Sequence, residues 1–283
     1  MTDDLGFAPP SGEGFADAVT VSWGDPSSDV FGFARIGVAD GASTSALGVL
    51  FSGNDVIESV AEGDLALAAS DWSSVRAGPL SISTLAPDDS TASPRERWRL
   101  EWDGAAELEL TAFSPPLSVA GGGMEGHEKV CRVSGTAGGR KVAGLGQRGR
   151  SWGVADWDRI GLARSLSAWW DDRAVVLSAL RPAKAKDHAH EELAAWLFEA
   201  DAGAAAVAEP RLSTTYDGEG RQRRAGLELF LTGDDDEFPR RAAGEVACGT
   251  SLDLGRLRLD CAFFHWRMDG AAGVGRYDVL RRA

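Results

Sequence analysis

Short apolar runs alternate with turn-forming residues along most of the chain, and this pattern predicts β-strands. The clearest case is residues 97–103 and 107–112, where apolar and charged positions alternate with a period of two. The apolar positions are Trp98, Leu100 and Trp102 in the first segment and Leu108, Leu110 and Ala112 in the second. Between them, Asp103-Gly104 is typical of a hairpin turn. The two segments therefore predict an antiparallel sheet with one face in water.

The same kind of pattern predicts strands over residues 31–38, 46–51, 227–231, 252–259 and 261–268. Residues 190–201 are ambiguous, because Leu193, Trp196 and Leu197 also have helical spacing. We predict a strand there, since the surrounding segments all have period two. The chain as a whole is predicted to be all-β.

Composition narrows the function. The 283 residues allow one large or two medium domains. The formal charge of −14 disfavours a nucleic-acid partner and anionic membrane surfaces, which need a concentrated positive surface. The amino-terminal residues lack the features of a secretory signal, and no apolar run is long enough to span a bilayer. We therefore expect a cytoplasmic protein without integral membrane association.

The sequence contains no convincing motif for a metal site or a catalytic nucleophile. The chain has three cysteines, Cys131, Cys248 and Cys261, and they are widely spaced. This pattern fits buried thiols in a reducing compartment better than a disulfide framework or a zinc site. His188 and His190 would share one face of a strand, as in cupin metal sites, but alanine stands where a cupin-like spacing places a glutamate. The acidic residues 234–237 lack the ligand spacing of a calcium loop and are interpreted as a solvated turn. No nucleophile elbow occurs.

Residues 144–160 form the densest cluster of functional residue types. Two tryptophans, three arginines and two aspartates are punctuated by four glycines. Residues 144–149 match the G-x-G-x-x-G pattern of dinucleotide-binding proteins, but bulky aromatics and glycine follow where a helix would have to begin. The glycines are better explained as bends and bulges in a β-structure.

Tryptophan is abundant, with ten residues in the chain. Core filling with hydrogen-bonded indole N–H groups accounts for most of them. The functional alternative is an aromatic cavity for a lipophilic ligand, in which ring faces also stabilise a carbocation.

Residues 144–157 resemble the signature of the carotenoid 1,2-hydratase (hydroxyneurosporene synthase) superfamily. Residues 31–51, 124–135 and 266–275 resemble the flanking strands of that family. The resemblance implies two tandem lipocalin-like antiparallel β-barrel or sandwich domains, which we place at residues 1–138 and 139–283. Related folds serve hydration of isoprenoid double bonds, cyclisation of tocopherol precursors and Diels–Alder cyclisation.

The chain departs from the family pattern at two places. Many relatives carry an acid and a histidine between the arginine and the Ser-Trp-Gly of the signature, whereas this chain has Gly149 and Arg150. Relatives often have an acid soon after the closing Gly-x-Gly, whereas here Arg276 and Tyr277 precede Asp278. A proton donor expected in relatives is therefore missing from the signature.

Two functions remain open. The first is a cofactor-independent enzyme that hydrates, cyclises or isomerises a lipophilic substrate, with no metal. Its candidate catalytic acids are Asp156 and Glu128, and its candidate substrate-binding residues are Arg148, Ser151, Trp152, Trp157 and Trp266. The second is a non-catalytic lipocalin-like carrier of a hydrophobic metabolite, which needs no acid in its apolar pocket. In a purely structural reading, Arg148 and Asp156 form an ion pair at the domain junction.

Overall fold

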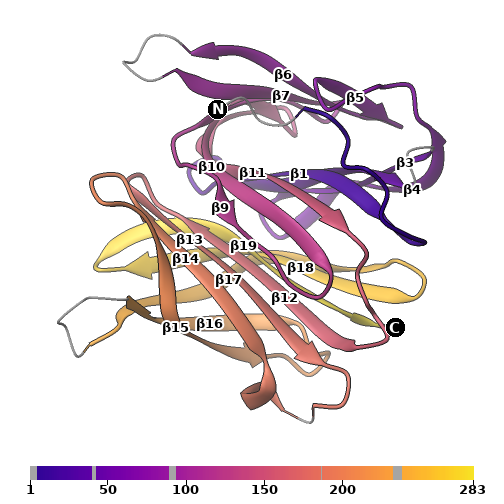
Figure 1. Cartoon of the computed structure of the whole chain (residues 1–283). Helices are drawn as coiled ribbons and strands as arrows, with labels where there is room; N and C mark the ends of the chain where they lie inside the picture. The colour runs from indigo at the N-terminus through magenta and orange to yellow at the C-terminus, as the bar shows by residue number, and fades with distance from the viewer. Residues whose placement is uncertain (1–4, 40–42, 89–93, 186, 232–237) are drawn as a thin grey trace. The chain divides into compact units, whose positions relative to one another are not determined.

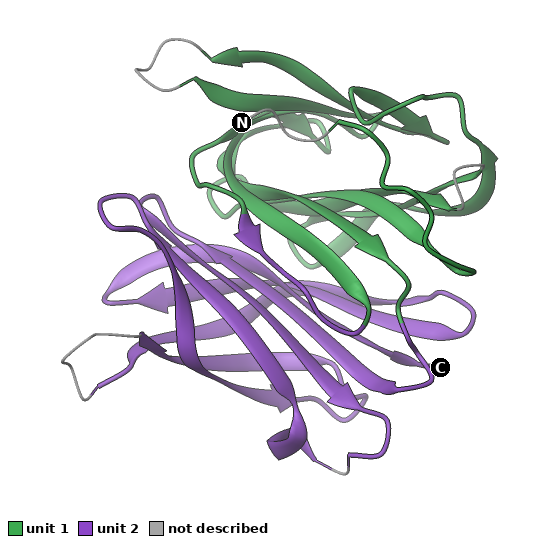
Figure 2. Cartoon of the chain, in the orientation of Figure 1, with its two compact units in different colours: residues 1–116, 123–155 green, residues 117–122, 156–283 purple. Residues whose placement is uncertain are grey.

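The computed structural model describes residues 5–39, 43–88, 94–185, 187–231 and 238–283. The chain forms two compact units, shown in different colours in Figure 2. Unit 1 comprises residues 1–116 and 123–155, and unit 2 comprises residues 117–122 and 156–283. Almost all regular structure in the described residues is β-strand, as the sequence predicted.

Unit 1 is built on an antiparallel sheet with the strand order β4-β3-β2-β1-β11-β10-β8-β7-β6-β5 (Figure 1). The sheet curls so far that β5 packs against β2 and β3. Its inner face therefore encloses an apolar core. The strands are β1 (Ala16–Asp25), β2 (Val30–Ala39), β3 (Ser43–Ser52), β4 (Asp55–Ala66), β5 (Ser74–Ala77), β6 (Leu80–Asp88), β7 (Arg95–Trp102), β8 (Ala106–Ala112), β10 (Met124–Ala137) and β11 (Arg140–Gly153).

The β7–β8 hairpin confirms the strongest local prediction. Trp98 lies opposite Leu110 and Leu100 lies opposite Leu108, and all four side chains are buried. The turn uses Gly104 at φ +71°, a left-handed conformation that glycine adopts without the Cβ penalty. The period-two pattern thus predicted both the strands and the face that enters the core.

Unit 2 is a closed barrel of β12 to β19, in which β12 pairs with both β13 and β19. Apolar side chains fill much of its interior. The elements are β9 (Leu117–Ser118), β12 (Ile160–Trp169), β13 (Arg173–Pro182), the 3-10 turn η1 (His188–His190), β14 (Glu192–Glu199), β15 (Gly203–Tyr216), β16 (Gln222–Leu231), β17 (Arg240–Asp253), β18 (Leu257–Met268) and β19 (Ala271–Arg282).

The ambiguous segment near residue 195 is the strand β14, so the predicted strand is confirmed. Leu193, Ala195 and Leu197 contribute to the barrel core at a strict period of two. The helix-like spacing of this segment depended on Trp196, which the alternation of side chains along a strand places on the other face. Tertiary pairing with β13 and β15 overrides the local preference.

The boundary predicted between residues 138 and 139 lies in the turn of the β10–β11 hairpin, within unit 1. These two strands make an extended antiparallel pair, from Met124 opposite Gly153 to Ala137 opposite Arg140. The acidic run 234–237 lies outside the described residues. Among the residues that the structure describes, no helix has the length and apolar character needed to cross a membrane.

Candidate functional site

The residues that the sequence analysis singled out fall in several different environments. Arg148, Ser151 and Trp152 lie on β11, and Glu128 lies on β10. Because side chains alternate along a strand, Arg148 and Trp152 share the inner face of the unit 1 sheet, opposite Val21 and Asp17 of β1. Glu128 and Ser151 belong to the opposite face of the same hairpin.

Glu128 of β10 lies against Gly149 of β11. The two residues are register partners, and a Cβ atom built on Gly149 would be 2.2 Å from Glu128 Oε2. On the same outer face, the Arg35 guanidinium donates hydrogen bonds to Thr20 Oγ1 at 3.1 Å and Ser151 Oγ at 3.5 Å. The missing side chain at position 149 therefore makes room for a carboxylate.

Asp156, Trp157 and Trp266 belong to unit 2. Asp156 accepts hydrogen bonds from the backbone N–H groups of Asp158 and Arg159 at 3.2 Å, and its side chain is 46% exposed. It thus caps a turn that precedes β12. Trp266 is 1% exposed and belongs to the barrel core, where it stacks on Phe264.

A group of charged and aromatic side chains gathers on the inner face of unit 1, close to Arg148. The Arg148 guanidinium carbon lies 5.0 Å from the centroid of the Trp98 ring, and Lys129 Nζ lies 5.6 Å from the same centroid. Lys129 Nζ also pairs with Glu96 Oε2 at 2.5 Å. Arg148 is 1% exposed and Lys129 is 5% exposed, so both cations are held in an apolar interior.

Two further polar atoms of this group have spare hydrogen-bonding capacity. Trp98 Nε1 and Thr84 Oγ1 are both buried, and neither has a hydrogen-bond partner among the described residues. Thr84 of β6 lies directly opposite Trp98 of β7. Because buried polar groups are normally paired, these two atoms mark a place where a ligand atom would complete the hydrogen bonding. We call Thr84, Glu96, Trp98, Lys129 and Arg148 the inner polar site.

A second buried network lies beside the inner polar site. The Asp17 carboxylate accepts hydrogen bonds from Arg150 NH2 at 2.8 Å, from Trp72 Nε1 at 2.9 Å and from the Ala8 N–H at 2.8 Å. Arg150 also lies over the Trp152 ring, with 5.3 Å from its guanidinium carbon to the centroid. Both oxygens of Asp17 accept hydrogen bonds, so this network is suited to holding β1 and β11 in place.

Sequence reasoning missed Glu96 and Lys129, although the signal was present. Extending the alternation of Trp98 and Leu100 by one step places Glu96 on the inner face. The same step from Cys131, which is in the core, places Lys129 there. A charged residue at an inward position was the available sign of a polar site.

The chemistry available at the inner polar site is electrostatic. Arg148, Lys129 and the Trp98 indole N–H are hydrogen-bond donors within an apolar interior, and this suits an oxygen that becomes negative during a reaction. Cys131, on the same face, is not suited to act as a nucleophile, because burial raises the pKa of its thiol to about 12.

Comparisons with solved structures agree with this fold. A protein from Nitrosomonas europaea provisionally named ATTH has a TM-score of 0.65 at 16% identity, covering 94% of this chain and 91% of the other. Kievitone hydratase from Nectria haematococca has a TM-score of 0.63 at 11% identity, covering 99% of this chain and 94% of the other. CghA, solved with Sch210972, has a TM-score of 0.62 at 10% identity, with 95% and 89% covered.

At this level of identity the likenesses establish the fold, and in fold the resemblance predicted from residues 144–157 is confirmed. No curated protein sequence matches the chain. A family model described as "Domain of unknown function (DUF7064)" matches residues 2–283.

Proposed function

The chain belongs to the family described as a domain of unknown function, DUF7064, and we propose a function for it from its structure. We propose that it is a cofactor-independent enzyme acting on a lipophilic substrate. The reaction is a hydration, cyclisation or isomerisation of an isoprenoid, polyene or polyketide-like molecule. The single observation that carries this proposal is the inner polar site. There Trp98 Nε1 and Thr84 Oγ1 are buried beside two buried cations, and neither atom has a hydrogen-bond partner within the described ranges of the chain.

This arrangement favours a substrate with an apolar body and one acceptor oxygen, such as a carbonyl. Trp98 Nε1 would donate to that oxygen, while Lys129 and Arg148 would stabilise the negative charge that builds up on it as bonds rearrange. Removing one such preorganised donor typically costs about 10²–10³ in kcat. The surrounding apolar core would hold the hydrocarbon part of the substrate.

Glu96 is the group we propose to move a proton. Its carboxylate pairs with Lys129 Nζ and its side chain is 30% exposed, so Glu96 has contact both with the rest of the inner polar site and with water. A carboxylate at the apolar interior favours an enzyme over the carrier considered from the sequence. Glu128, on the outer face, would serve only a substrate bound on that face.

The neighbouring structures support the reaction class without choosing the reaction. One of them is named as a hydratase, and another was solved with Sch210972. Fold alone does not fix chemistry, so the choice among hydration, cyclisation and isomerisation rests on experiment.

The test combines substrate discovery with matched variants. Protein isolated from its host is analysed by native mass spectrometry for a bound lipophile, and lipophilic host extracts are incubated with the purified protein. A product that gains one water indicates hydration, and a product of unchanged mass indicates cyclisation or isomerisation. Lys129→Met and Arg148→Met should each reduce turnover about 100-fold. Arg97→Met, on the outer face of β7, should not.

Two results would count against the proposal. Full turnover by both variants, with folding confirmed by circular dichroism, would remove the inner polar site from the reaction. Recovery of an unchanged lipophile from every incubation would instead identify a carrier.

A further inference from the structure

A buried polar cluster lies inside the barrel of unit 2, outside the signature residues 144–157. Arg164 of β12 stands between Leu162 and Leu166, which belong to the barrel core, and it is 2% exposed. Its NH1 group donates hydrogen bonds to Thr214 Oγ1 at 3.1 Å and to Tyr277 Oη at 3.2 Å. Thr214 Oγ1 and Tyr277 Oη are themselves 2.7 Å apart.

The carboxylate that pairs with Arg164 comes from Glu191, directly after the η1 turn. Arg164 NH2 donates to Glu191 Oε2, and the Glu191 side chain is 0% exposed. In contrast, none of the three residues of η1 is buried. The turn therefore lies on the barrel and inserts one carboxylate into it.

The turn is fastened to this carboxylate from outside. His188 Nδ1 lies 2.5 Å from Glu191 Oε1, and the His188 ring stacks on Tyr216 with a centroid distance of 6.2 Å. Burial raises the pKa of the Tyr277 hydroxyl, so this group stays protonated at neutral pH and can donate a hydrogen bond.

Glu191 leaves part of the cluster unsatisfied. Arg164 Nε and the Tyr216 hydroxyl are buried, and neither has a hydrogen-bond partner in the described part of the chain. Two unused donors around one internal carboxylate indicate that the site can bind more acceptor atoms than Glu191 supplies.

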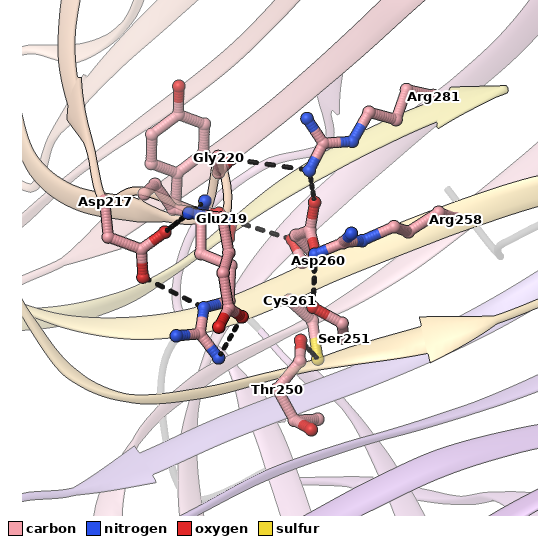
Figure 3. A network of polar contacts seen from close by, with 12 residues as sticks. Asp217, Glu219, Gly220, Thr250, Ser251, Arg258, Asp260, Cys261 and Arg281 are labelled. Carbon is pink, nitrogen blue, oxygen red and sulfur yellow. Dashed lines mark hydrogen bonds and ion pairs between the residues drawn. The ribbon is translucent and has the colours of Figure 1, made fainter. Parts of the chain in front are cut away.

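Polar contacts around Asp260 link strands of the same barrel without involving Glu191 (Figure 3). Asp260 is 1% exposed and accepts hydrogen bonds from Ser251 Oγ at 2.5 Å and from Arg258 Nε at 2.9 Å, and it also pairs with Arg281. Gln222 Nε2 donates to the backbone carbonyls of Asp260 and Tyr277 at 2.9 and 2.7 Å. Release of Glu191 would therefore leave the pairing of these strands intact.

We propose that Arg164, Thr214, Tyr216 and Tyr277 form a carboxylate-binding site, and that Glu191 occupies it until an amphiphilic carboxylate displaces it. The charge and donor geometry favour a carboxylate, because one already binds there. The apolar interior favours an aliphatic tail, since barrels of about this size accommodate either packed side chains or one small ligand. This site is separate from the inner polar site, so it neither requires nor supports the proposed enzyme activity.

The test uses decanoate and 1-decanol, which have the same tail and different head groups. Isothermal titration calorimetry on the full chain should show that Glu191→Gln binds decanoate at least about tenfold more tightly than wild type, because the competing carboxylate is gone. The affinity for 1-decanol should not change. Glu192→Gln, which removes the same charge from an exposed neighbour, should behave as wild type. Adding Arg164→Gln to Glu191→Gln should abolish the gain.

A second variant, Tyr216→Phe, tests the proposal independently in case Glu191→Gln does not fold. Tyr216→Phe removes a hydroxyl that has no hydrogen-bond partner among the residues that the structure describes, so the fold should be retained. Decanoate binding to the otherwise wild-type chain should weaken several-fold. Equal affinity of Glu191→Gln for decanoate and 1-decanol would overturn the proposal. So would an unchanged decanoate affinity in Tyr216→Phe, or absence of decanoate binding to every variant.

Discussion

The buried Asp17–Arg150 pair is the contact on which unit 1 should depend most strongly. Asp17 is 1% exposed and the Arg150 side chain is 4% exposed. Oδ1 accepts one hydrogen bond, from Arg150 Nε, whereas Oδ2 accepts three, from Arg150 NH2, Trp72 Nε1 and the Ala8 N–H. This asymmetry allows the cost of replacing Asp17 to be worked out for two different substitutions.

In Asp17→Asn, the amide nitrogen should take the Oδ1 position, because that orientation loses one hydrogen bond and keeps three. The variant loses one charge-assisted bond, worth about 1.5–3 kcal/mol, and removes the carboxylate charge that pairs with the buried Arg150 guanidinium. Removing one partner of a buried pair costs about 3–5 kcal/mol, so we expect about 3 kcal/mol for Asp17→Asn. Asp17→Ala loses all four bonds, and we expect about 5 kcal/mol.

The assay is urea denaturation followed by circular dichroism, with hydrogen–deuterium exchange to locate the loss of protection in β1 and β11. The matched control is Asp103→Asn, which breaks an exposed aspartate–arginine pair with Arg76, with 56% and 54% of the side chains exposed. Surface pairs contribute little, so this variant should unfold at the same urea concentration as wild type. Equal effects of Asp17→Asn and Asp103→Asn would refute the reasoning.

Three further predictions concern pH, backbone packing and thiol reactivity. Burial raises the pKa of Asp25, but hydrogen bonds from backbone N–H and serine hydroxyl groups outweigh this and lower it below 3.8. The ionised Asp25 should therefore stabilise the fold fully above pH 3.8, and this effect should be lost as the pH falls through its lowered pKa. Thermal melts of wild type and Asp25→Asn at a series of pH values should show melting temperatures that converge at low pH. Gly146→Ala would place a Cβ atom 2.2 Å from a backbone carbonyl oxygen, which cannot easily move. In Gly149→Ala the Cβ atom would instead meet the Glu128 carboxylate, which is the end of a flexible side chain. Only Gly146→Ala should therefore lower the melting temperature strongly. Burial raises the pKa of the Cys131 thiol to about 12, so mass spectrometry should find it unmodified by iodoacetamide at pH 8 until the chain is unfolded with urea.

Each of these has an opposite result that would contradict it. A constant difference between wild type and Asp25→Asn from pH 7 to pH 2 would mean that the charge of this group does not stabilise the fold. Equal melting temperatures for the two alanine variants would mean that the backbone contact relaxes freely. Rapid alkylation of the native protein at Cys131 would mean that its strand opens readily.

The local elements were predictable because each depends on neighbouring residues. The β7–β8 hairpin follows from the alternation around Trp98 and from a turn that needs Gly104 at positive φ. The strand β14 required one more argument, namely the period of the surrounding segments, because the spacing of Leu193, Trp196 and Leu197 alone pointed to a helix.

The candidate site was less predictable, because it depends on how the sheet curls. The sequence shows that Arg148 is part of a dense motif, but not that β7 brings Trp98 within 5.0 Å of its guanidinium. Proximity in sequence was also misleading: Glu128 and Lys129 are adjacent and lie on opposite faces of β10. The motif residues Asp156 and Trp157 follow the last strand of unit 1 and belong to unit 2.

The pairing of β12 with β19 has a consequence for how the protein is made. Leu162 of β12 lies opposite Arg281 of β19, so more than half the length of unit 2 must be synthesised between the two partners. Until β19 leaves the ribosome, the edge of β12 has no partner strand, and an unpaired edge is a template for aggregation. Folding of this unit is thus expected to wait for translation of its last strand, and chaperone demand should be highest just before that point.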